Sequence, residues 1–161
     1  MILSFFLIII MKMNITRYRS YLNSIAIIWS MSFNIIRNNN SQTTDLFRLL
    51  SFLNSEDILI NFLQSGVEAL QKDLQKVMSN RIDMSKTWIA LERFSLLKWN
   101  GFTKTLLIHH LVQTEVKDEM SDTEFMIFRT EVINLCDQTF SWIWTNEIRP
   151  FCRAYFDHIV K

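Results

Sequence analysis

Two short stretches, Lys98-Trp99-Asn100-Gly101-Phe102 and Ser141-Trp142-Ile143-Trp144, decide the fold that the sequence predicts. Their tryptophans, Trp99 and Trp142, lie 43 residues apart. Two apolar stretches with helical spacing, 102–114 and 122–140, run between them and are joined by a polar connection. A helix that is apolar on all sides is usually buried in the centre of a bundle. The sequence therefore predicts a central buried helical hairpin.

Amphipathic helices are expected around this hairpin. Apolar residues recur three and four positions apart over 45–54, 56–79 and 86–98, which is the spacing of one helix face. The polar runs 37–45 and 80–85 are expected to be loops, and Ser121 and Glu124 form a capping box that opens the helix 122–140. The predicted fold class is thus an all-α helical bundle.

The composition of the 161 residues fits one helical domain with a substantial core. Hydrophobic residues make up 49% of the chain, whereas there are only two glycines and one proline. Tight turns draw on Gly, Asn and Pro, so an all-β fold is disfavoured. The net charge of +1 and the lack of a basic stripe argue against a nucleic-acid partner.

The N-terminal region is treated separately, with residues 1–40 as an apolar segment and 41–161 as the helical domain. Residues 1–11, MILSFFLIIIM, are too short to span a bilayer, which takes about 20 residues. Residues 1–40 are therefore expected to be a leader, an extra helix or a membrane-associated segment. Cys136 and Cys152 are expected to be buried free thiols.

No residue pattern indicates catalysis, a metal or a cofactor. Neighbouring helical residues point about 100° apart, so His109 and His110 do not share a ligand site easily. Two glycines cannot supply a Gly-rich phosphate loop, and no Gly-x-Ser-x-Gly elbow is present. The chain is accordingly expected not to be an enzyme.

An apolar groove is the remaining candidate site, because amphipathic helices of a bundle can accept a further helix between them. The predicted groove is formed by 56–79, 86–98 and the start of 102–114. Its residues are Leu63, Val67, Leu70, Leu74, Met78, Phe94, Leu97, Trp99 and Leu106.

The residues around the two tryptophans resemble two motifs of the Bcl-2 family of apoptosis regulators. Lys98-Trp99-Asn100-Gly101 resembles the Asn-Trp-Gly-Arg motif, and Trp142-Ile143 resembles the opening of the second motif. Phe62-Leu63-Gln64-Ser65-Gly66-Val67 resembles the third motif in spacing. The motif anchors are therefore Trp99, Gly101, Trp142 and Ile143. The resemblance covers about residues 55–158 and implies a Bcl-2-like bundle.

The resemblance implies a regulator of apoptosis that sequesters the death-motif helix of pro-apoptotic relatives. Gly101 stands where the family has an Arg that pairs with an Asp of the bound helix, so Lys104 or Arg93 is the substitute charge partner. Val67 replaces the Asp of the third motif, which favours a pro-survival role. The location implied is the cytoplasm, on mitochondrial or other intracellular membranes. Alternatives are binding of a signalling adaptor, self-association as a homodimer, or a secreted cytokine-like bundle.

Overall fold

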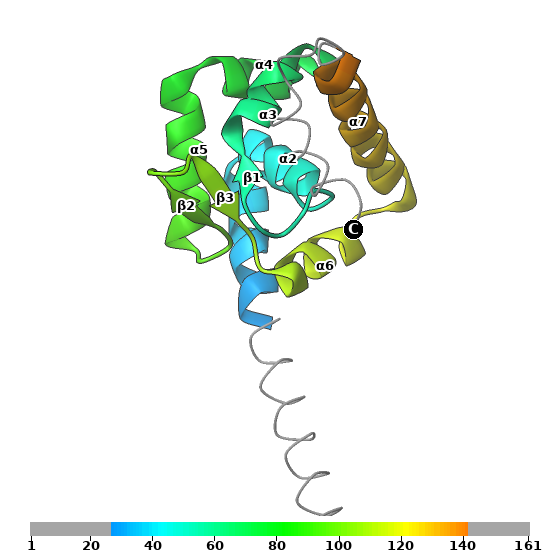
Figure 1. Cartoon of the computed structure of the whole chain (residues 1–161). Coiled ribbons are helices and arrows are strands. Elements are labelled where there is room, and N and C mark those ends of the chain that lie inside the picture. The colour runs from blue at the N-terminus through cyan, green and yellow to red at the C-terminus, as the bar shows by residue number, and fades with distance from the viewer. Residues whose placement is uncertain (1–26, 142–161) are drawn as a thin grey trace, which may run out of the picture.

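The computed structural model describes residues 27–141, and most of these residues are helical, as the sequence predicts (Figure 1). A small antiparallel sheet is added to the helices, so the all-α prediction is wrong in this respect. The elements are a helix over 27–39, α2 (Ser41–Leu50), β1 (Ile58–Leu59), α3 (Ile60–Ser65), the 3-10 helix η1 (Val67–Ala69), α4 (Lys72–Ser79), α5 (Arg81–Arg93), β2 (Lys98–Asn100), β3 (Thr105–Leu107), α6 (His110–Asp118) and α7 (Asp122–Ser141).

The sheet has the order β1-β3-β2, with both pairs antiparallel. Ile58 pairs with Leu106 across β1 and β3, and Trp99 pairs with Leu106 across β2 and β3. The β2–β3 hairpin thus joins the sheet through β3, which lies between β1 and β2. We call this hairpin, residues 98–107, the wing.

Helix α2 lies at the centre of the core (Figure 1). Four of its apolar side chains, Leu46, Phe47, Leu49 and Leu50, are completely buried, and α4, α5, α6 and α7 all contact this helix. Phe33 from the helix over 27–39 is also buried, with its ring centroid 5.7 Å from that of Phe47. Residues 27–39 therefore share the core of the helical domain that was predicted to begin at residue 41.

The predicted central hairpin is wrong in its first half. Residues 101–104 form a turn and 105–107 a strand, so α6 begins only at His110. The Asn100 side chain favours a turn by accepting hydrogen bonds from Phe102 N and Thr103 N, and the apolar run Leu106-Leu107-Ile108 fits a short strand as well as a helix. The second half is confirmed by α7, but α7 lies at the side of the molecule (Figure 1).

The predicted helix 56–79 is divided into β1, α3, η1 and α4. Pairing with β3 draws Ile58 into the sheet, and α3 ends at Gly66.

The two predicted loops are helix boundaries, because the side chain of Asn40 caps α2 and that of Asn80 caps α5. An Asn oxygen at the N-cap satisfies free backbone N–H groups, so one residue ends one helix and starts the next. The predicted helices 45–54 and 86–98 correspond to α2 and α5 with shifted boundaries.

The predicted capping box opens α7 and is confirmed in detail. The Ser121 N–H and Oγ both donate to Glu124 Oε2 at 2.9 Å, while the Glu124 N–H donates to Ser121 Oγ at 3.3 Å. Arg48 of α2 reaches Glu124 Oε1 at 3.0 Å. The bonds from Ser121, aided by Arg48, hold the pKa of Glu124 below its ordinary value.

We expect Glu124→Ala to lower the free energy of unfolding by about 1 kcal/mol at pH 7. Since the folded-state pKa is depressed, the contribution is present above the ordinary Glu pKa of about 4.3 and is lost as pH falls through the folded value. Urea denaturation of the wild type and the variant at neutral and acidic pH measures the difference in their free energies of unfolding. Glu124→Gln keeps an acceptor without the titration, so a pH-dependent difference between Gln and Ala variants would contradict the explanation.

Three residues other than glycine adopt left-handed backbone conformations. Asp57, Ser95 and Lys104 have φ values of 53°, 55° and 55°, and neither glycine has a positive φ. Such a conformation costs a residue with a Cβ about 1–2 kcal/mol. The chain makes these turns without glycine.

Candidate functional site: the α5–wing surface

The predicted groove is closed in this structure. Six of its residues are buried in the core, namely Leu63, Leu70, Leu74, Met78, Leu97 and Leu106. Val67, Phe94 and Trp99 are partly buried against the same core. The residues therefore come together, but as packing between elements and not as an open groove. Trp142 and Ile143 lie outside the described residues.

Among residues 27–141, the tip of the wing carries the most exposed large apolar side chain. Phe102 is 97% exposed. The turn beneath it is fixed, because Asn100 Oδ1 accepts hydrogen bonds from Phe102 N at 3.0 Å and Thr103 N at 3.2 Å. The hydroxyls of Thr103 and Thr105 lie 2.7 Å apart, and Thr105 Oγ1 donates to Asp57 Oδ1 at 3.2 Å. Phe102 is thus displayed on a hydrogen-bonded support.

Helix α5 lies beside the wing and exposes two isoleucines (Figure 1). Ile82 is 65% exposed and Ile89 is 57% exposed. They stand seven residues apart and so share one helix face. Thr87 and Leu91 are buried on the opposite face. We call the exposed set Ile82, Lys86, Ile89, Arg93, Phe102 and Lys104 the α5–wing surface.

The α5–wing surface is basic. Residues 81–104 contain five Lys or Arg and two acids. Lys86 is paired with Asp83 at 3.3 Å, and Glu92 Oε1 accepts from Trp99 N at 3.4 Å. Arg93 and Lys104, the predicted charge partners, are both exposed and make no ion pair with another residue of the described part. Within residues 27–141, no acidic side chain neutralises these two charges.

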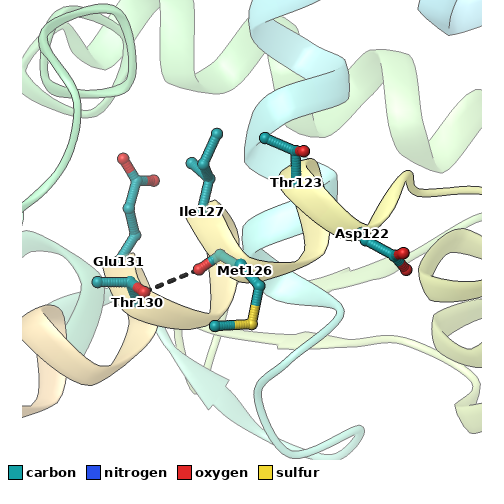
Figure 2. Close-up of a pocket in the computed structure, with 6 residues that line it drawn as sticks. All are labelled: Asp122, Thr123, Met126, Ile127, Thr130 and Glu131. Carbon is teal, nitrogen blue, oxygen red and sulfur yellow. Dashed lines mark hydrogen bonds between the residues drawn. The ribbon is translucent and has the colours of Figure 1, made fainter.

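A pocket of about 660 Å³ lies along α7, on the other side of the molecule from the wing (Figures 1 and 2). It is lined by Asp122, Thr123, Met126, Ile127, Thr130 and Glu131. Figure 2 shows Thr123, Ile127 and Glu131 in a row along the helix, while Thr130 Oγ1 donates to the Met126 carbonyl at 2.8 Å. Met126 and Ile127 are 55% and 42% exposed, so the pocket has an apolar floor with acidic ends.

Glu131 is the unusual polar group of this pocket. The side chain is buried, and its Oε1 accepts from Gln71 N at 3.2 Å. Its Oε2 is buried and has no hydrogen-bond donor among the described residues. Desolvation raises the pKa of Glu131, although the bonds from Gln71 partly oppose this. Nearby on α7, burial raises the pKa of the free Cys136 thiol to about 11, which keeps it protonated at neutral pH.

The two adjacent histidines have a local structural role. His109 Nδ1 accepts from Leu111 N at 3.2 Å and so caps α6, and its ring contacts those of Trp29 and His110. No cluster of metal-binding side chains occurs among residues 27–141. Within the same residues, no helix is long and apolar enough to cross a bilayer.

Sequence reasoning did not select Phe102, Ile82 or Ile89 for the site. Ile82 and Ile89 lie seven residues apart and share one helix face, but this spacing does not distinguish an exposed face from a buried one. The exposure of Phe102 depends on the hairpin, which the helical interpretation of 102–114 excluded.

The comparisons with known proteins identify a family but no function. No curated protein and no solved structure matches the chain. The model of a family described as a domain of unknown function, DUF7779, matches residues 35–125, which is more than half of the chain and includes the α5–wing surface. The chain therefore belongs to the DUF7779 family.

Proposed function

We propose that this chain is a protein-binding module whose α5–wing surface accepts an acidic segment with apolar anchors. The observation that carries the proposal is the full exposure of Phe102 on a fixed turn. Burial of such a side chain in a partner supplies about 1.5–3 kcal/mol. Because the turn is already ordered, little of this gain is lost to ordering on binding.

The surroundings of Phe102 favour a protein partner over a nucleic acid. Aromatic and Arg side chains are enriched at protein interfaces, and here Arg93 and the two isoleucines of α5 accompany the phenylalanine. The exposed side chains of Ile82 and Ile89 carry no hydrogen-bond donor or acceptor, whereas base edges are read largely through hydrogen bonds. The excess of basic residues over 81–104 then selects an acidic partner surface.

Site-specific photo-crosslinking tests this function. A chain with p-benzoyl-phenylalanine in place of Phe102 should form adducts with protein segments rich in Asp, Glu and apolar residues. The matched control carries the same group in place of Gln42, which is exposed on α2. Adducts with nucleic acid only, or equal protein adducts at both positions, would contradict the proposal.

Phe102→Ser separates binding from stability. Because Phe102 is almost wholly exposed, we expect the free energy of unfolding of the variant to differ from that of the wild type by less than about 0.5 kcal/mol. Crosslinking from a p-benzoyl-phenylalanine probe at position 89 should be lost in the same variant. Thermal and urea unfolding give the stability. A large loss of stability would show that Phe102 packs within the domain.

The resemblance to the Bcl-2 family supports a second candidate, a pro-survival regulator of apoptosis on intracellular membranes that binds the death-motif helix of pro-apoptotic relatives. An acidic amphipathic helix fits the exposed Arg93 and Lys104, the charge partners expected from the sequence. Titration of labelled death-motif peptides against the chain tests it. Absence of binding at micromolar concentration would exclude this partner and leave the more general binding role.

A further inference from the structure

We infer that a second copy of this chain is a partner of the α5–wing surface, which docks head to tail on the α7 pocket. This inference rests on the proposed function and adds the identity of the partner. The α5–wing surface and α7 lie on opposite sides of the molecule (Figure 1). One copy can therefore present its wing to a neighbour while its own α7 pocket stays open to another.

The charges of the two surfaces are complementary. Residues 81–104 carry five basic and two acidic side chains, whereas residues 110–141 carry two basic and seven acidic ones. Glu119 and Glu124 are engaged by Arg37 and Arg48, but Asp122 and Asp137 are exposed without an ion pair to a described residue. Opposite potentials of this kind steer association and fix its orientation.

The apolar groups are complementary as well. Phe102 projects from the wing, and the α7 pocket offers Met126 and Ile127 as a partly exposed floor. A volume of about 660 Å³ lies in the range of about 300–1,000 Å³ that encloses a drug-sized group, so it accommodates a phenylalanine ring with adjoining side chains. Ile133, 58% exposed and one heptad beyond Met126, extends the apolar stripe along α7.

A cation next to Phe102 matches the exposed acid of the pocket. Lys104 lies two residues from Phe102 and is exposed, and Asp122 lines the pocket and is exposed as well. An ammonium group of one copy can pair with this carboxylate of the next, which favours the docked orientation. The contact between two different patches makes the interface heterologous, which generates open chains or closed rings.

Mixing of two blocked variants tests the inference with the full chain. Sedimentation up to about 100 µM should show concentration-dependent association of the wild type that weakens in high salt, and Phe102→Ser and Met126→Lys should each weaken it at least about tenfold. An equimolar mixture of the two variants retains one intact wing and one intact α7 pocket, so we expect a 1:1 dimer that grows no further. Ile28→Ser, which removes an apolar residue that is 60% exposed elsewhere, should associate like the wild type.

The possible results separate the inference from the proposed function. A wild type that stays monomeric, or a mixture that does not form the dimer, overturns head-to-tail docking even if each variant is folded by circular dichroism. If the probe at position 102 still crosslinks another acidic protein, the binding function stands without self-association. If it crosslinks no protein, both proposals fail.

Discussion

Gln113→Ala should lower the free energy of unfolding by about 3 kcal/mol. The Gln113 amide is buried, and its Nε2 donates to the carbonyls of Leu50 at 3.2 Å and Leu53 at 3.0 Å. The Leu50 carbonyl also accepts from Leu53 N, but the Leu53 carbonyl has no other protein donor in the described part. The substitution therefore leaves a buried acceptor unpaired at the end of α2, in addition to a small cavity.

Two further variants assign this loss to the hydrogen bonds. Gln113→Leu preserves most of the volume but has no donor, so it should still lose about 2 kcal/mol. Thr114→Ala, at the neighbouring exposed position of α6, should be nearly neutral. Urea denaturation compares the three. If the Leu variant is as stable as the wild type, the amide does not stabilise the end of α2.

Gly66→Ala should lower the free energy of unfolding by about 2–3 kcal/mol through overpacking. A Cβ at Gly66 would lie 2.5 Å from Leu135 Cδ1, 2.7 Å from Thr139 Oγ1 and 2.8 Å from the Leu135 carbonyl oxygen. The leucine methyl can rotate away, but the carbonyl belongs to the backbone of α7. The helix would have to move away from α3.

Gly101→Ala is the matched control, because the chain has one other glycine. The nearest atom to its added Cβ is Trp99 Nε1 at 3.4 Å, and Gly101 is exposed at the wing tip. The Gly101→Ala substitution should change the free energy of unfolding by less than about 0.5 kcal/mol. Equal losses at the two positions would indicate that the glycine backbone, and not the contact with α7, determines the effect of Gly66→Ala.

The sequence allowed prediction of the parts of the fold that depend on neighbouring residues. Ser121 and Glu124 are three residues apart, and the helix that they open was predicted almost to its boundaries. The sheet was missed, because its β1–β3 pair joins Ile58 to Leu106 across 48 residues, and a short apolar run does not reveal such pairing.

The candidate site was predictable only in its charges. Arg93 and Lys104 were selected as charge partners and are exposed together with the wing and α5. The sequence could not predict that the apolar groove is closed. Helical spacing identifies the apolar face of a helix but does not show which neighbouring element covers that face. Leu74 and Met78 are covered by the core, whereas Phe102 has no cover.

The left-handed residues show where this domain has unused stability. Natural proteins seldom reach their stability optimum, and Ser95 holds a φ of 55° at an exposed position between α5 and the wing. A glycine adopts that conformation without the Cβ penalty. The turns made without glycine are therefore natural starting points for engineering a more heat-resistant form that leaves the exposed phenylalanine and its basic neighbours untouched.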